Sequence, residues 1–146
     1  MICTFFGHRD APESIRASLA NQIEELILHH GVNTFYYGNH GNFDAMVAHE
    51  LKKAKRRHPS ISCILVLAYL PTQPLADTET LFPEGIESVP KRFAISFRNR
   101  YMLRASQYVI GYVDRGFGGA AQFFALAKKR GLKTINLAEI PPSSGG

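Results

Sequence analysis

The chain of 146 residues suits one domain with a single hydrophobic core, because 45% of its residues are apolar. Seventeen Lys and Arg against twelve Asp and Glu give a formal net charge of +5, which favours anionic partners. The sequence has no apolar run of about eighteen residues and no basic N-terminal segment followed by an apolar core, so we expect no membrane span, no export signal and a cytoplasmic location.

Cysteine and histidine usage excludes several further classes of site. Cys3 and Cys63 lie in apolar, strand-like runs, so we expect small buried thiols rather than a disulfide framework. The six histidines include no pair four residues apart, and neither a Walker lysine motif nor Gly-x-Ser-x-Gly occurs. We therefore expect no metal site and no resident cofactor.

Strand and helix patterns alternate along the chain. Short apolar runs rich in β-branched and aromatic residues predict strands at 2–6, 34–37, 61–68, 108–113 and 134–137. Apolar residues spaced by three or four predict helices between them: one from Asp10, a possible N-cap, to Gly31, one from Phe43 through the basic run 52–57, and others over 91–105 and 118–130. The basic run is interpreted as the solvated last turn of its helix, where cations complement the helix dipole.

Two segments fall outside this alternation. Residues 70–90 contain Pro71, Pro74, Pro83 and Pro90 and four acids, so no regular element is expected there. This segment is either a lid over a binding site or a passive surface insertion. Residues 141–146 are expected to form a disordered tail, which leaves 1–140 as the domain.

The alternation predicts a single Rossmann-like three-layer α/β sandwich with a mostly parallel, five-stranded sheet in the order 3-2-1-4-5. In that order the first and fourth strands are neighbours. The turns at Gly7-His8-Arg9 and Gly116-x-Gly118-Gly119 would then meet beyond the carboxyl ends of the strands, with the polar turn 38–42 beside them. Glycines after a strand expose bare backbone, and the first turn of a helix offers unpaired N–H groups to an anion. A phosphate-bearing, nucleotide-like ligand is therefore expected.

The motifs together resemble the SLOG superfamily. They are Gly7-His8-Arg9, Gly38-x-x-Gly41-x-x-Asp44, Arg98-Asn99-x-x-Met102 and Gly116-x-Gly118-Gly119, and the resemblance covers about residues 2–137. The superfamily joins the LOG-type phosphoribohydrolases to DNA-processing protein A and to a branch of uncharacterised bacterial Rossmann-like proteins, which this chain resembles most. Glycine turns after strands are common, so the specificity of the match comes from the order and spacing of all four motifs.

The resemblance implies a site for a nucleotide derivative, such as an ADP-ribose or NAD-related molecule or a nucleoside phosphate. The residues assigned to ligand binding are Gly7, His8, Arg9, Gly38, Asn39, Gly41, Asn42, Asp44, Arg98, Asn99, Gly116, Gly118, Gly119 and Gln122. In the LOG enzymes the signature is Pro-Gly-Gly-x-Gly-Thr-x-x-Glu; here Asp114 and Arg115 replace its start, and Gln122 falls at the glutamate position. A neutral amide does not take up a proton at pH 7, so no catalytic residue is assigned and binding is favoured over LOG-type hydrolysis.

Two other functions remain open from the sequence. In a glycosidase acting on nucleoside phosphates, Asp44, Glu50 or an acid of the 70–90 segment would replace the missing carboxylate. Alternatively, the net charge and the basic helix would serve single-stranded DNA binding, as in DNA-processing protein A. A homodimer is also expected through the helix over 91–105, whose apolar residues exceed one face: Phe93, Ile95, Phe97, Tyr101 and Met102.

Overall fold

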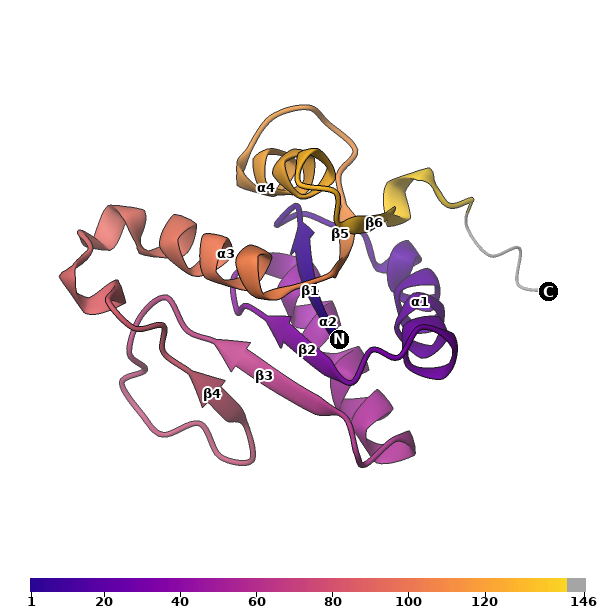
Figure 1. Cartoon of the computed structure of the whole chain (residues 1–146), viewed down its shortest axis with the longest axis horizontal. Helices are drawn as coiled ribbons and strands as arrows, with labels where there is room; N and C mark the ends of the chain where they lie inside the picture. Colours follow the sequence, from indigo (N-terminus) through magenta and orange to yellow (C-terminus); the bar gives the residue numbers. More distant parts are fainter. Residues whose placement is uncertain (142–146) are drawn as a thin grey trace.

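The strands form one parallel sheet, in the order β4-β3-β2-β1-β5-β6 (Figure 1). The computed structural model describes residues 1–141. Its helices and strands are β1 Ile2–Gly7, α1 Arg16–His29, β2 Thr34–Tyr37, α2 Gly41–Arg57, β3 Ser62–Val66, β4 Glu79–Leu81, α3 Ala94–Ala105, β5 Tyr108–Tyr112, α4 Gly119–Lys129 and β6 Lys133–Asn136. The expected disordered tail, apart from Pro141, lies outside the described residues.

The sheet has six strands rather than the expected five, and the additional strand changes the order. The five expected strands follow one another as β3-β2-β1-β5-β6, which corresponds to 3-2-1-4-5, and β4 is added beside β3. The additional strand, β4, pairs in parallel with β3 at the edge of the sheet, with Ile64 opposite Glu79. A further backbone bond of 2.8 Å from the Leu67 N–H to the Leu81 carbonyl extends this pairing. The expectation that 70–90 lacks regular structure was therefore wrong. Three residues are too few to show a strand periodicity in the sequence.

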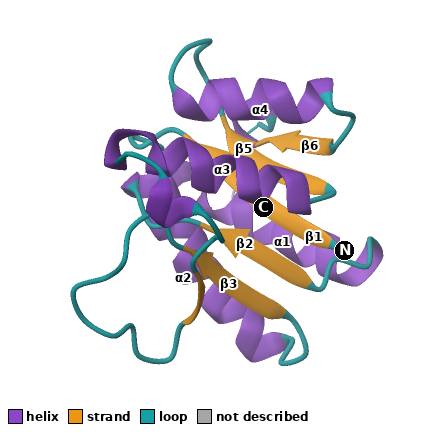
Figure 2. Cartoon of the chain, turned by 60° about the vertical axis from the view of Figure 1, so that its left-hand side comes forward, coloured by secondary structure: helices purple, strands orange, loops and turns teal. Residues whose placement is uncertain are grey.

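The helices cover both faces of the sheet, giving three layers (Figure 2). Alternate residues of β1 point to opposite faces: Cys3 and Phe5 belong to one core, and Phe6 belongs to the other. The first core is closed by α1 and α2 through residues such as Leu19 and Leu51. The second is closed by α3 and α4, through Met102, Leu103, Phe123 and Phe124. The α/β class and the parallel sheet are as expected.

The helix ends differ in detail from the expected ones. Asp10 does not cap α1, which instead follows a short 3-10 turn, Glu13–Ile15, that has Pro12 at its N-cap. The Asp10 carboxylate instead accepts a hydrogen bond of 2.8 Å from Arg115. Similarly, α3 starts at Ala94 after a 3-10 turn, Lys91–Phe93. The basic run does form the last turns of α2, as expected.

The position of β1 determines where a ligand pocket is possible. β1 pairs with β2 on one side and with β5 on the other, with Gly7 opposite Tyr112. The chain adds β2 and β3 on one side of β1, and later adds β5 and β6 on the other side. In parallel sheets, the crevice beyond the carboxyl ends of the strands at such a change of side is the usual binding region.

Both cysteines are free thiols, and burial raises the pKa of Cys63 to about 11. None of the helices within residues 1–141 has the length and apolarity needed to cross a bilayer.

Candidate functional site

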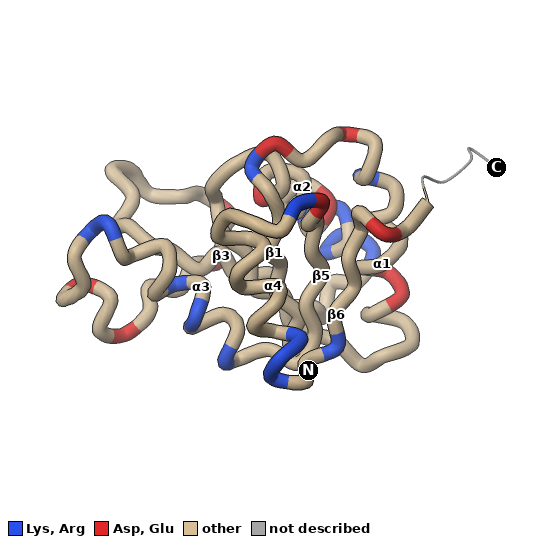
Figure 3. The backbone as a smooth tube through the Cα atoms, turned by 90° about the horizontal axis from the view of Figure 1, so that it is seen from above, with Lys and Arg blue, Asp and Glu red and all other residues tan. Residues whose placement is uncertain are grey.

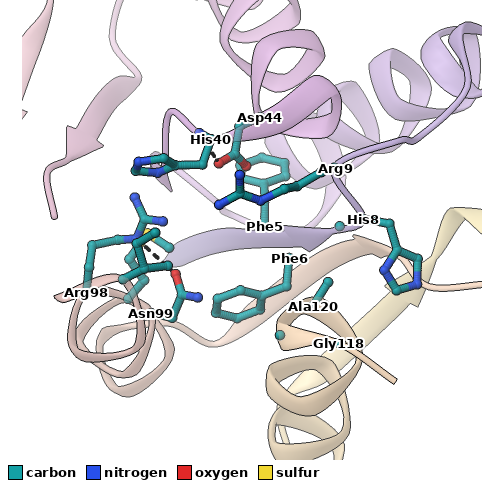
Figure 4. Close-up of a pocket in the computed structure, with 14 residues that line it drawn as sticks. Phe5, Phe6, His8, Arg9, His40, Asp44, Arg98, Asn99, Gly118 and Ala120 are labelled. Carbon is teal, nitrogen blue, oxygen red and sulfur yellow. Dashed lines mark hydrogen bonds between the residues drawn. The ribbon is translucent and has the colours of Figure 1, made fainter. Parts of the chain in front are cut away.

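A pocket of about 340 Å³ lies beyond the carboxyl end of β1 (Figure 4). The N-termini of α2 and α4 and one face of α3 complete its walls. Its lining residues are Phe5, Phe6, Gly7, His8, Arg9, His40, Asp44, Ile95, Arg98, Asn99, Met102, Gly118, Gly119 and Ala120. The volume lies near the lower end of the usual range for small-molecule sites, which is roughly 300–1,000 Å³.

Arg98 is the most unusual residue of this pocket, because its charged side chain is only 3% exposed. Its Nε donates to Asn99 Oδ1 at 2.9 Å, and its Nη1 donates to the Val66 carbonyl at 3.2 Å. Within residues 1–141 its Nη2 makes no hydrogen bond and the side chain makes no ion pair within 4.0 Å. Burial lowers the pKa of Arg98, although Asp44 favours the charged form. A guanidinium stays charged even when it is buried, and the N–H groups of Arg98 Nη2 remain available to a ligand.

Asp44 and His40 lie at the start of α2, near Arg98. The Asp44 Oδ2 accepts a 2.9 Å hydrogen bond from the backbone N–H of His40, which fixes the carboxylate at the helix N-terminus. Burial raises the pKa of Asp44, against the opposing effects of this bond and of Arg98 and Arg9. Burial, together with the same two arginines, lowers the pKa of His40. The His40 Nδ1 is buried and has no hydrogen-bond partner in the described chain.

Arg9 adds a second guanidinium to the same end of the pocket. Figure 4 shows its side chain extending from the loop after β1 towards His40 and Asp44. The loop is held by its backbone, since the Arg9 carbonyl accepts a 2.8 Å bond from the Asn42 N–H. Arg9 is exposed and Arg98 is buried, so a ligand entering from solvent would meet the first before the second. Two cations against one carboxylate make this end suited to an anion.

The N-terminus of α4 forms the opposite end of the pocket. Gly118, Gly119 and Ala120 line it, and Figure 4 shows Gly118 and Ala120 away from His40 and Asp44. Gly118 has a φ of +96°, a conformation that favours glycine. The intrahelical bonding begins with the Gln122 N–H, which donates to the Gly118 carbonyl at 3.0 Å. The preceding N–H groups of the first turn have no intrahelical acceptor and carry partial positive charge.

His8 contributes to the wall of the pocket, but its ring points away from the arginine end (Figure 4). The ring lies edge-on to Tyr112, with 6.3 Å between centroids. The His8 Nε2 lies 3.5 Å from Asp114 Oδ1, but the two atoms do not have hydrogen-bond geometry. This buried nitrogen therefore has no hydrogen-bond partner in the described chain. The backbone N–H of His8 donates to the Tyr112 carbonyl at 3.1 Å, which ties the β1 turn to β5.

At three of the assigned glycines, other atoms of the protein occupy the space that a Cβ would need. A Cβ on Gly38 would lie 2.5 Å from Arg98 Nη1 and 2.9 Å from Asp44 Oδ2. A Cβ on Gly7 would overlap the ring of Phe43, and one on Gly41 would lie 2.8 Å from the Arg9 Cα. These glycines therefore shape the pocket by allowing Arg98, Arg9 and α2 to approach the strand ends.

The structure brings eight of the fourteen assigned residues together at the pocket. The six that do not line it within residues 1–141 are Gly38, Asn39, Gly41, Asn42, Gly116 and Gln122. Gln122 is exposed on α4, and Glu50, which the sequence offered as an alternative carboxylate, is buried beside Arg16 and Lys53 at 3.6 and 3.5 Å. No residue of the 70–90 segment is among the lining residues of the described chain either, so a lid role for it stays a prediction.

Sequence reasoning missed several lining residues. His40 lies within the turn 38–42 that the sequence singled out, and its place between two glycines was the available signal. The others are apolar or small: Phe5, Phe6, Ile95, Met102 and Ala120. Met102 belongs to the motif Arg98-Asn99-x-x-Met102 but was not assigned to ligand binding, and no pattern separates the other four from core residues.

Lys and Arg outnumber Asp and Glu in the segments that form α3 and α4 (Figure 3). Residues 88–113 and 116–138 contain no Asp or Glu. Their nine cations are Lys91, Arg92, Arg98, Arg100, Arg104, Lys128, Lys129, Arg130 and Lys133. Five of these cations lie on α3 or in the turn before it, whereas Lys128, Lys129, Arg130 and Lys133 lie at or just after the end of α4 opposite the pocket.

A second cavity, of about 780 Å³, lies between α2, β3 and residues 76–79. Its lining cations, Lys52, Lys55 and Arg56, are exposed, and Lys55 is already bonded to the carbonyls of Pro59 and Ile61. It has no counterpart of the buried Arg98, so the pocket at β1 is the stronger candidate.

Neither a scan against protein-family models nor a search of curated proteins found a match for this chain. The resemblance to the SLOG superfamily therefore stays a prediction that rests on the four motifs. Residues 1–141 contain no group of three or more His, Cys, Asp or Glu side chains placed to hold a metal ion.

Proposed function

We propose that the protein binds a nucleotide derivative in the pocket beyond β1 and acts as a binding or sensor protein that leaves its ligand intact. The observation that carries this proposal is the buried guanidinium of Arg98, whose Nη2 is free of hydrogen bonds within residues 1–141. Burying a charge is costly unless it is paired, and an anionic ligand would supply the partner.

The pocket offers different groups to different parts of such a ligand. Arg98 and Arg9 would bind phosphate oxygens, because guanidinium groups donate two parallel hydrogen bonds to them. The amide of Asn99 and the carboxylate of Asp44 would hold ribose hydroxyl groups. The first turn of α4 would receive a second phosphate or a pyrophosphate oxygen. An ADP-ribose-like or NAD-like molecule, or a nucleoside phosphate, carries this combination of groups.

Binding without hydrolysis is supported by the acids of the site. Asp44 is the single carboxylate among the lining residues of the described chain, and one of its oxygens is already bonded to the His40 N–H. Gln122 is exposed on α4 and, as an amide, does not exchange a proton at neutral pH.

Calorimetric titration with AMP, ADP-ribose and NAD tests this proposal. We expect Arg98→Ala and Arg9→Ala to weaken binding by about tenfold or more, since one charge-assisted hydrogen bond contributes roughly 1.5–3 kcal/mol. Arg100→Ala is the matched control, because Arg100 lies on the same helix but is exposed and outside the pocket. Equal affinity in all three variants, or no binding by the wild type, would contradict the proposal.

A glycosidase is the second candidate, because burial raises the pKa of Asp44 in the direction that suits a general acid. Chromatography of AMP after incubation with the protein distinguishes the two functions. Free adenine that forms with the wild type but not with Asp44→Asn would establish hydrolysis and overturn the binding-only proposal. An unchanged ligand in both samples is the result we expect.

A further inference from the structure

Phe117 is the most exposed large apolar residue of the described chain, at 72%. It lies in the loop between β5 and α4, one residue before Gly118, which lines the pocket. Single exposed apolar residues are common on protein surfaces and need no explanation by themselves. The position of this one, between glycines at the edge of a pocket, is what calls for an explanation.

The loop is anchored on one side of Phe117 and free on the other. Arg115 holds its start, donating to Asp114 Oδ1 and to Asp10 Oδ1, both at 2.8 Å. Gly116 and Gly118 flank the phenylalanine, and a Cβ at either position would meet nothing within 4 Å. Glycine also has the widest range of backbone conformations. Phe117 therefore lies between two glycines with open space around them, next to Arg115, whose hydrogen bonds hold the start of the loop.

The pocket has one apolar wall that a flat ring would fit. Phe6 lines the pocket from β1, and Ile95 and Met102 line it from α3. Phe117 is not itself among the lining residues of the described chain, but consecutive Cα atoms are about 3.8 Å apart, so its Cα lies about that far from the Cα of Gly118 at the pocket edge. A rotation of the loop about Gly116 and Gly118 that turns Phe117 towards the pocket would cover the second face of an aromatic ring lying against Phe6, Ile95 and Met102.

We propose that Phe117 stacks on the base of the bound ligand and so makes the site specific for nucleotides over sugar phosphates. This inference rests on the proposed function, and it adds that recognition has two independent parts. The arginines bind the phosphate, whereas Phe117 contacts only a ligand that carries an aromatic base. Stacking of this kind is tolerant of base identity, because every base presents a π-face.

Calorimetry with AMP and with ribose 5-phosphate separates the two parts. We expect Phe117→Ala to weaken AMP binding by about tenfold, as loss of one base–aromatic stack does, and to leave ribose 5-phosphate binding unchanged. Phe117→Leu should behave like Phe117→Ala, because its side chain is apolar but has no ring. Phe93→Ala, a change at another exposed phenylalanine outside the pocket, is the control that should bind AMP as the wild type does.

Phe117→Trp gives a direct optical readout, since the chain contains no tryptophan. We expect this variant to retain affinity for AMP and its fluorescence to be quenched by AMP but not by ribose 5-phosphate. If the wild type binds AMP while Phe117→Ala binds it equally well and Phe117→Trp shows no quenching, the stacking role is wrong and the proposed function stands. If the wild type binds neither compound, both proposals fail.

Discussion

Arg98 and Gly38 are the pair of residues on which the pocket depends. The guanidinium is buried, donates to one carbonyl and one side-chain amide, and lies close to the position that a Cβ on Gly38 would occupy. A chain selected only for stability gains little from a buried cation without a carboxylate partner, because desolvation of the charge is not compensated. We interpret the arrangement as one that presents Arg98 to an anion.

Gly38→Ala tests this packing. The added Cβ lies 2.5 Å from Arg98 Nη1, so the guanidinium must move, and we expect a loss of about 1–3 kcal/mol in the free energy of unfolding together with weaker nucleotide binding. Urea denaturation and calorimetry measure the two effects. Gly116→Ala is the control for the stability measurement alone, since its Cβ would meet nothing within 4 Å and its φ is not in the left-handed region. Similar losses in both variants would show that Gly38 has no special role.

Asp44 predicts a characteristic dependence of stability on pH. Burial raises its pKa in the folded protein above the ordinary value of 3.8, so its contribution to stability is fully present below that value and is lost as the pH rises through the folded pKa. Asp44→Asn replaces the carboxyl group with an amide that does not ionise, so this variant does not lose stability in that way as the pH rises. We therefore expect the unfolding free energy of Asp44→Asn, relative to the wild type, to increase from pH 3 towards neutral pH in urea titrations. A difference that is constant or decreasing with pH would mean that the carboxyl is not destabilised by burial.

At the level of elements, the two helices that begin at the pocket differ in what their first turns hold. The start of α2 is occupied by the protein itself, through the Arg9 carbonyl on the Asn42 N–H and the Asp44 carboxylate on the His40 N–H. The start of α4 follows a glycine loop and has no side-chain cap. The orphan N–H groups of α4 are therefore the ones available to a ligand.

The link between α1 and α2 predicts the opposite pH dependence from Asp44. Glu24 of α1 contacts Arg57 Nη2 at 3.2 Å and His58 Nε2 at 2.6 Å, and its pKa is lowered: burial raises it, but the hydrogen bonds and charges of these two partners outweigh burial. This contribution is present above the ordinary glutamate pKa of 4.5 and is lost as the pH falls through the lowered pKa. We expect Glu24→Gln to cost about 1 kcal/mol at pH 7 and less at pH 3, measured by urea denaturation. A cost that stays the same at pH 3 would contradict this assignment.

The elements that sequence reasoning found were those with a period long enough to recognise. The apolar stripe of α1, the glycine that ends it and the apolar run of β3 are local features, and all correspond to observed elements. β4 has three residues and is defined by its pairing with β3, which is a tertiary contact. For the same reason, the proximity of Gly38 to Arg98 and the exposed position of Gln122 were not visible in the sequence.

For the whole molecule, the sheet order explains why motifs far apart in the chain meet. β1 lies between β2 and β5, so the loops that follow β1 and β5 reach one crevice, and α3 adds Arg98 from the side. The anticipated convergence of separate loops depends on the adjacency of β1 and β5, and the additional strand at the far edge leaves that adjacency intact.

A homodimer through α3 stays a prediction at this scale. Within the chain, Met102 is buried and Ile95 and Phe97 pack against a small cluster with Ala68 and Ile86, so most of the apolar surface of α3 is already used. Phe93, just before α3, is 49% exposed and is the residue most available to a partner copy. Light scattering across a concentration series should show a dimeric wild type and a monomeric Phe93→Asp. A monomeric wild type at every concentration would exclude the dimer.

The most direct test of the central claim is a crystal structure of the protein grown with ADP-ribose or AMP. We predict ligand density in the pocket beyond β1, with a phosphate oxygen within hydrogen-bond distance of Arg98 Nη2 and with the glycosidic bond intact. Density in the cavity between α2 and residues 76–79, or a ligand whose phosphates do not contact Arg98, would contradict the account.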